Sequence, residues 1–233
     1  MVIRPYLAMT AAEFRECKDF SGSIGWMSCL FSPYGAGLSN LPQALPEGSL
    51  LILSDYTPML GHDPQTIAGQ LEDCIRAFGC RGLLLDFQRP NVEQTVHLAA
   101  LLAAVLPCPV GVSDEYAKEL DCPVFLPPVP PDTPLTEYIA PWAGREIWLE
   151  LALDGQVITL TQQGAAVTPL LHSVGLTGGF AEESLHCHYR IETTSDKAVF
   201  TLWRTREDLE KLLEEADQLG ITTAVGLYQE LHL

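Results

Sequence analysis

Basic residues are scarce in this sequence: 13 Lys and Arg stand against 30 Asp and Glu, and the formal net charge is −17. A surface of that sign repels the phosphates of nucleic acids and the headgroups of anionic membranes. We therefore expect neither nucleic acid nor a membrane as a partner. A neutral or weakly cationic ligand fits the charge better.

Long apolar runs are absent as well, and no stretch of the chain approaches the roughly 20 residues that a membrane-spanning helix needs. The first residues lack the apolar segment and the small-residue cleavage site of a signal peptide. Hydrophobic residues nevertheless make up 47% of the chain, which is too much for a disordered protein. The sequence thus predicts a globular, cytoplasmic protein.

Paired cysteine motifs are missing too. The seven cysteines are odd in number and scattered, and none has the Cys-x-x-Cys spacing, which predicts reduced structural thiols. His186 and His188 would share one face of a strand, but two ligands at that spacing are weak grounds for a metal site, and packing is the commoner explanation. We expect neither a metal nor another cofactor.

The sequence does contain an alternation of apolar strands and capped helices over 233 residues, a length that suits one domain. Strand followed by helix implies right-handed crossovers and a parallel sheet, so we predict an α/β fold. The expected strands are residues 25–31, 49–55, 82–87, 109–113 and 123–126. The expected helix caps are Thr10 with Glu13, Asp63, Asn91 with Gln94, and Asp114.

The region 145–203 has a different pattern. Residues 146–151 and 157–161 flank Asp154-Gly155, which is a typical hairpin turn. Residues 186–191 and 198–203 form a second candidate hairpin. We predict a small antiparallel insertion at 145–203 within a single domain, 1–233, followed by a helix at 205–219 and a last strand.

The strand at 82–87 is the most informative, because it is apolar and ends abruptly in polar residues. In a barrel, alternation would place Gly82, Leu84, Asp86 and Gln88 inward, and the intervening apolar residues against the outer helices. Active sites of such barrels lie at the carboxyl ends of the strands. Asp86 and Gln88 are therefore the leading candidates for a site.

The order of elements resembles glycoside hydrolase family 18, the chitinase-like barrels, and especially the short bacterial members linked to spores and peptidoglycan. The family's fourth strand carries Asp-Gly-x-Asp-x-Asp-x-Glu, which aligns with residues 81–88. Gly82, Asp86 and the aromatic Phe87 match. Three acidic positions are lost, because Arg81, Leu84 and Gln88 stand in their places.

The C-terminal third also resembles this family, with His188-Tyr189, a strand at 198–203, a helix at 205–219 and Gly220-Ile221. The family's last strand carries a tryptophan, and here Ala224 or Val225 stands in its place. The resemblance covers about residues 50–230 and implies a TIM (β/α)8-type barrel. Whether the first 50 residues complete it, or leave it incomplete or distorted, stays open.

In the family, the glutamate protonates the glycosidic oxygen, and the substrate's acetamido group is the nucleophile, positioned by the neighbouring aspartate. Gln88 at the glutamate position cannot donate that proton, and loss of general acid catalysis costs about 10² to 10⁴ in rate. The amide can still donate and accept hydrogen bonds. The resemblance therefore implies an N-acetylglucosamine-type glycan bound with little or no hydrolysis.

Other residues are weaker candidates for ligand contacts. Asp55, Asp114 and Glu115 follow neighbouring strands and could supply a relocated acid, although Asp114 is equally good as a helix cap. His62 lies in a loop after Asp55, where capping by Asp63 is the commoner role. Aromatic faces suit sugar rings, but core packing is the better expectation for them; the two aromatic candidates are Trp142 and Trp148.

Three functions stay open: a pseudoenzyme that binds a small molecule or oligosaccharide, an active glycoside hydrolase with a relocated carboxylate, and a non-catalytic structural or interaction protein. The sequence leaves the oligomeric state unknown.

Overall fold

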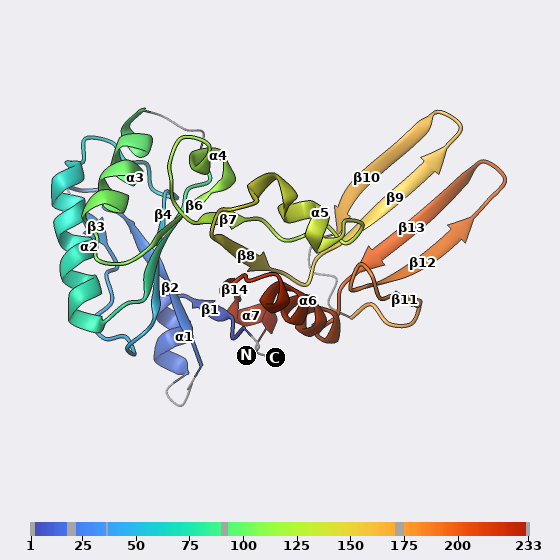
Figure 1. Cartoon of the computed structure of the whole chain (residues 1–233), viewed down its shortest axis with the longest axis horizontal. Coiled ribbons are helices and arrows are strands. Elements are labelled where there is room, and N and C mark those ends of the chain that lie inside the picture. Colours follow the sequence, from blue (N-terminus) through green and yellow to red (C-terminus); the bar gives the residue numbers. More distant parts are fainter. Residues whose placement is uncertain (1–2, 18–21, 36, 90–92, 171–174, 232–233) are drawn as a thin grey trace.

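The protein, described here from a computed structural model, is built around a closed barrel of eight parallel strands with helices between them (Figure 1). The structure describes residues 3–17, 22–35, 37–89, 93–170 and 175–231. The barrel strands are β1 (Tyr6–Met9), β2 (Ile24–Phe31), β4 (Leu50–Ser54), β5 (Gly82–Asp86), β6 (Val110–Ser113), β7 (Val124–Leu126), β8 (Ile147–Leu151) and β14 (Thr223–Leu227).

The first strand closes the barrel. β1 pairs in parallel with both β14 and β2, so the predicted TIM (β/α)8-type fold is confirmed and the barrel is complete. A two-residue strand, β3 (Leu38–Ser39), adds antiparallel to β2. The N-terminal residues that least resembled the family therefore supply two of the eight barrel strands.

The helices cover the outside of the barrel, and two of them begin at caps that the sequence indicates. Thr10 and Glu13 form a capping box, and Asp63 accepts from the backbone amides of Gln65 and Thr66. The predicted cap at Asn91 lies outside the described residues. The helices are α1 (Ala11–Glu16), α2 (Pro64–Phe78), α3 (Glu93–Val105), α4 (Asp114–Ala117), α5 (Leu135–Ile139), the 3-10 helix η1 (Ala140–Trp142), α6 (Arg206–Gln218) and α7 (Tyr228–Leu231).

Alternation along β5 separates the two layers of the core as predicted. Leu84 belongs to the cluster inside the barrel, whereas Leu83 and Leu85 pack outward with the helices. At the amino-terminal end of the strands, the interior is filled by Trp148, which is 3% exposed. Its ring lies over Gly82 and Gly111, where an added Cβ would come within 3.0 and 2.4 Å of it.

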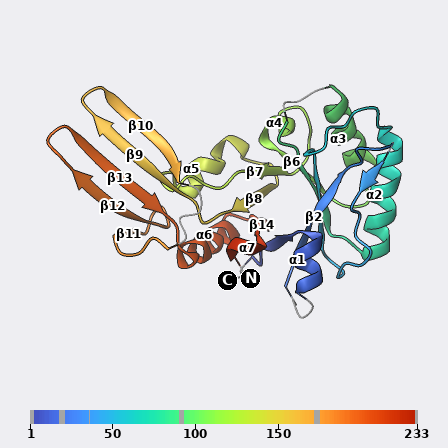
Figure 2. The ribbon, with the colours of Figure 1, turned by 180° about the vertical axis from the view of Figure 1, so that it is seen from behind.

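A second, antiparallel sheet projects from the barrel beyond α5 and α6, as Figures 1 and 2 show. We call it the projecting sheet. Its strands, in spatial order, are β10 (Gly164–Leu170), β9 (Gly155–Thr161), β13 (Lys197–Trp203), β12 (Cys187–Thr193) and β11 (Phe180–Glu182).

One predicted hairpin is correct and the other is wrong. β12 and β13 pair antiparallel, as expected. Residues 147–151 and 155–161, however, do not pair with each other: β8 is a barrel strand between β7 and β14, and β9 pairs with β10 and β13. Asp154-Gly155 marks the point where the chain leaves the barrel, and the turn of the real hairpin lies at Gln162-Gln163.

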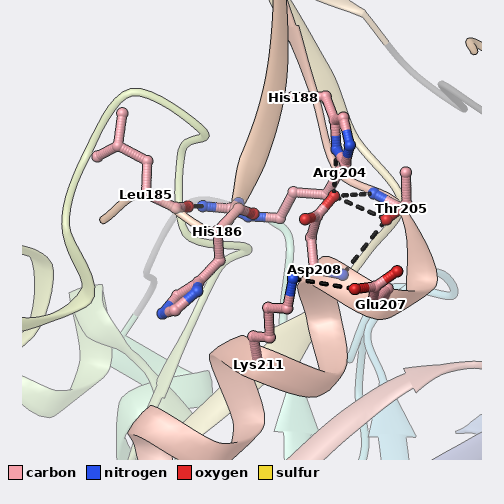
Figure 3. Close-up of polar contacts among 8 residues, drawn as sticks. All are labelled: Leu185, His186, His188, Arg204, Thr205, Glu207, Asp208 and Lys211. Atoms are coloured by element: carbon pink, nitrogen blue, oxygen red, sulfur yellow. Dashed lines mark hydrogen bonds and ion pairs between the residues drawn. The ribbon is translucent and has the colours of Figure 1, made fainter. Parts of the chain in front are cut away.

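Polar contacts join the projecting sheet to α6 (Figure 3). His188 Nδ1 lies 2.9 Å from Asp208 Oδ2, and the same carboxylate caps α6 by accepting from the amide of Thr205. Arg204, only 4% exposed, donates to the backbone oxygens of Leu185 and His186 and also to those of Val129 and Pro130. Across the described parts of the chain, no helix has the length and apolar character needed to span a bilayer.

Candidate functional site

The candidate site is at the carboxyl end of β5, where Asp86 points into the mouth of the barrel. Its register partner on β4 is Ser54. Gln88 lies just beyond the strand, and its Nε2 donates a hydrogen bond of 2.5 Å to Asp86 Oδ1. The two residues predicted to form a site therefore do meet each other there.

Asp55 holds the loop that carries Gln88. It is 2% exposed, and its two carboxylate oxygens accept the backbone amides of Gln88 and Arg89, each at 2.9 Å. In addition, Nε of Arg89 donates a hydrogen bond of 2.9 Å to the backbone oxygen of Asp55. Because Asp55 is almost fully buried and both of its carboxylate oxygens accept backbone amides, we assign it the role of positioning the loop.

A cavity of about 280 Å³ opens beside Asp86 and Gln88. Asp114 and Glu115, at the end of β6, line it as well, so four of the predicted residues share one cavity. Asp114 is the first residue of α4 and not its cap, since Ser113 occupies the cap position. The remaining lining residues are Leu85, Phe87, Arg89, Ser113, Phe125, Pro127 and Glu150.

Glu150 is the site residue that the sequence analysis missed. It lies on β8 and lines the same cavity as Asp86. Both carboxylates also line a smaller adjoining cavity of about 60 Å³, which leads toward the interior residues Ile52 and Val225. Glu150 therefore faces Asp86 across the barrel mouth.

Burial, and after it the negative charges of Asp86, Asp154 and Glu230, together raise the pKa of Glu150 to about 7. The pKa of Asp86 is also raised, chiefly by burial, against the opposing effect of its hydrogen bond from Gln88. Near neutral pH, Glu150 thus carries a proton for much of the time, while titrating readily. Such a group can donate a hydrogen bond or a proton to a ligand in the cavity.

Glu150 was not predicted because residues 146–151 precede the turn-like Asp154-Gly155 and were therefore assigned to a hairpin outside the barrel. In the barrel, the apolar residues Ile147, Leu149 and Leu151 pack outward, and Trp148 and Glu150 point inward. The same two-residue spacing, an interior apolar residue followed by a carboxylate, occurs at Leu84 and Asp86. This shared spacing is the feature of the sequence that could have indicated Glu150 as a site residue.

The remaining predicted ligand contacts lie elsewhere. His62 is 7% exposed, its Nε2 lies 3.0 Å from the backbone oxygen of Ser32, and its ring packs near Phe31. Trp148 is in the interior at the opposite end of the barrel, where its Nε1 donates to Glu146. Trp142, in η1, packs half-buried against the outer core. Among the described residues that line the cavity, none of these three occurs.

The histidines at 186 and 188 do not converge on a common point. His186 Nε2 contacts Glu215 Oε2 at 2.7 Å, whereas His188 contacts Asp208, and Figure 3 shows the two rings pointing apart. In the part of the chain that the structure describes, no group of three or more His, Cys, Asp and Glu side chains is placed to hold a metal ion.

Comparison with known proteins rests on structure alone, since no family model matches the sequence and no curated protein matches it significantly. A GH18 chitinase from Cycas revoluta, a double mutant in complex with (GlcNAc)4, superposes with a TM-score of 0.57 at 13% identity, covering 96% of this chain and 94% of that one. The chain has a GH18-like fold.

Two further structures agree with this fold. The C-terminal domain of a putative chitinase from Desulfitobacterium hafniense gives a TM-score of 0.54 at 9% identity, covering 98% of this chain and 94% of that domain. The spore cortex-lytic enzyme SleL of Bacillus cereus gives 0.54 at 10% identity and covers 88% of this chain. The present chain spans 63% of the length of that enzyme.

Proposed function

We propose that this GH18-like barrel protein binds an N-acetylglucosamine-type glycan in the cavity beside Asp86 and hydrolyses little or none of it. The observation that carries the proposal is the pair Asp86 and Gln88 at the mouth of the barrel, joined by a hydrogen bond. Gln88 occupies the position that aligns with the proton-donating glutamate of glycoside hydrolase family 18. An amide cannot donate that proton at a useful pH. The motif is thus degenerate, and the protein is a pseudoenzyme.

The size and chemistry of the cavity support a sugar ligand. Its volume of about 280 Å³ is close to the lower limit of about 300 Å³ for small-molecule sites, which suits one sugar ring of a longer glycan. Asp86 offers a hydrogen-bond acceptor for an acetamido N–H, and Phe125 offers an apolar surface. The GH18 neighbour from Cycas revoluta, whose structure holds (GlcNAc)4, is itself a variant with a glutamate replaced by glutamine.

A second candidate function is favoured by Glu150, whose pKa is raised to about 7. A general acid works best with a pKa near the working pH, and Glu150 lines the same cavity as Asp86. An active glycoside hydrolase with a relocated acid would therefore use Glu150 in preference to Asp55, Asp114 or Glu115, the carboxylates named from the sequence.

We further propose that residues 1–233 form one domain, with the projecting sheet as an insertion between β8 and α6. β8 and β14 are neighbours in the barrel although the whole sheet lies between them in the chain. The sequence-based boundary of 145–203 shortens accordingly to about 155–203, because β8 belongs to the barrel.

The test combines binding and turnover for the parent chain and three variants, Asp86→Ala, Gln88→Glu and Glu150→Gln. We expect the parent to bind chitooligosaccharides in calorimetry, and Asp86→Ala to weaken binding about 10- to 100-fold, the usual effect of losing a hydrogen bond to a charged group. We expect no turnover of aryl N-acetylglucosaminides by the parent, and turnover by Gln88→Glu.

The same assays distinguish the two candidates. If the parent turns over substrate and Glu150→Gln does not, the result would favour the active hydrolase over the pseudoenzyme. Glu119→Gln, at an exposed glutamate outside the cavity, is the matched control and should behave as the parent does. Absence of binding by the parent to any of these glycans would contradict both candidates.

A further inference from the structure

The projecting sheet has two chemically different faces. Residues directly opposite each other in an antiparallel sheet point to the same side. The registry places Val167 opposite Ile158, Ile158 opposite Phe200, and Phe200 opposite Ile191, so one apolar row crosses four strands. We call this side the apolar face. It also carries Ala165, Leu160, Ala198 and Thr193 in the next row, and Pro169, Gln156, Leu202, Tyr189 and Phe180 toward the barrel, so that its polar members in these rows are Thr193 and Gln156.

The opposite face, which we call the polar face, is mixed but carries the charged residues. One row holds Thr168, Val157, Thr201 and Arg190, and the next holds Ala166, Thr159, Val199 and Glu192. A sheet with one apolar and one polar side normally buries the apolar side against another layer. In this structure Phe180 is 67% exposed, Val167 57%, Ile191 45% and Leu160 41%.

Charge is distributed unevenly between barrel and sheet. Residues 155–181 contain no Asp, Glu, Lys or Arg at all. Residues 155–203 contain four acidic and two basic residues and so carry only −2 of the net charge of −17. Since the sheet extends away from the barrel, its apolar face lies at a distance from most of the negative charge (Figure 1).

The total surface is larger than a compact chain needs. A folded monomer of 25.5 kDa exposes about 10,000 Å², whereas this chain exposes 12429 Å². The excess of about 2,000 Å² exceeds the roughly 800 Å² that each partner buries in an interface of standard size. This excess belongs to the whole chain, to which a sheet extending from the barrel contributes, and it is large enough to include an interface of that size.

We propose that the apolar face of the projecting sheet binds the same face of a second copy of this chain, so that two sheets pack face to face in a twofold dimer. The partner must offer an uncharged, apolar and nearly flat surface, and the apolar face itself meets that description. A twofold contact needs only one self-complementary patch. With the twofold axis across the strands, the two acidic barrels lie at opposite ends of the dimer, where their repulsion is weakest. This inference is independent of the proposed glycan site.

The experiment is a mass measurement by size-exclusion chromatography with light scattering over a range of concentrations up to about 100 µM, within which standard interfaces associate. It compares the parent with Val167→Glu and Thr168→Glu. These two positions are adjacent on β10 and both exposed, but they point to opposite faces. Each variant adds the same charge to the same strand, so only the face differs.

We expect the parent to reach twice the chain mass of 25.5 kDa, Val167→Glu to remain at the single mass, and Thr168→Glu to dimerise as the parent does. Leu160→Glu, at a second exposed position of the apolar face, should repeat the result for Val167→Glu. A parent that stays monomeric at every concentration would overturn the proposal. So would equal dimerisation of Val167→Glu and Thr168→Glu, because the charge would then have the same effect on either face. Circular dichroism confirms that each variant is folded.

Discussion

At the scale of single residues, the protonation of Glu150 makes a contribution to stability that depends on pH. Burial and the neighbouring acidic residues raise its pKa to about 7, whereas a glutamate in an unfolded chain has a pKa of about 4.3. Between these values the folded state holds a proton that the unfolded state releases. The contribution of Glu150 to the free energy of unfolding therefore falls as pH rises through this window, by about 4 kcal/mol in all, and levels off above it.

Glu150→Gln removes this dependence, because the amide stays neutral at every pH. Between pH 5.5 and pH 8 we expect the parent to lose about 2 kcal/mol of stability that the variant keeps. Urea denaturation at the two pH values measures it. The control Glu119→Gln should lose as much stability as the parent between the two pH values. An equal loss in the parent and in Glu150→Gln would refute the raised pKa of Glu150.

The sequence could place Asp86 and Gln88 at the mouth of the barrel, because they lie at the end of an apolar strand whose burial is evident on both faces. It could not separate the roles of the other carboxylates. Asp55 and Asp114 both follow parallel strands, yet one is occupied by two backbone amides and the other lines the cavity. That difference depends on where the loop of residues 87–89 folds, which is a long-range contact.

At the scale of elements, the interior of the barrel depends on the packing of β8 against two glycines. An added Cβ at Gly111 would lie 2.4 Å from the ring of Trp148. Gly111→Ala should therefore displace the indole and lower the free energy of unfolding by about 1 to 3 kcal/mol, the usual cost of overpacking. Thermal or urea denaturation measures the change.

Gly69→Ala in α2 is the matched control, since a Cβ there meets nothing within 4 Å. It should stabilise the protein by about 0.5 to 1 kcal/mol, because alanine is the better helix former. A similar loss of stability in both variants would mean that Trp148 does not set the cost.

The elements that the sequence predicted correctly are those with strong local patterns: the leucine-rich strands β4 and β5 and the capped helices α1, α2 and α6. β8 was assigned to the wrong sheet, because a short, mostly apolar strand followed by Asp154-Gly155 is equally compatible with a hairpin. Strand pairing over long distances is not encoded in such local patterns, and only the closed barrel distinguishes the two arrangements.

At the scale of the whole molecule, Arg204 connects the projecting sheet to the barrel. Its guanidinium donates to four backbone oxygens from two separate loops and is almost fully buried, and this burial lowers its pKa. Arg204→Ala leaves these carbonyls without their donor, so we expect the free energy of unfolding to fall by about 3 kcal/mol. Limited proteolysis should then cut within residues 155–203 faster than in the parent.

Arg190→Ala is the control for that prediction. Arg190 is exposed on the polar face of the sheet, where it donates to the backbone oxygen of Thr177. It should change stability by less than about 0.5 kcal/mol, as exposed substitutions usually do. Unchanged proteolysis in Arg204→Ala would show that the sheet is held by its other contacts.

The position of β1 between β2 and β14 also has a consequence for folding during synthesis. Tyr6 is paired with Val225, so β1 waits for a strand that is synthesised much later. During synthesis, the barrel stays open between these two strands until β14 has left the ribosome, and closing it requires a contact between residues far apart in the sequence. Such long-range closure is slow and leaves an unpaired strand edge exposed meanwhile. Until β14 enters the barrel, the unpaired edge of β1 therefore makes the growing chain prone to aggregation or to chaperone binding.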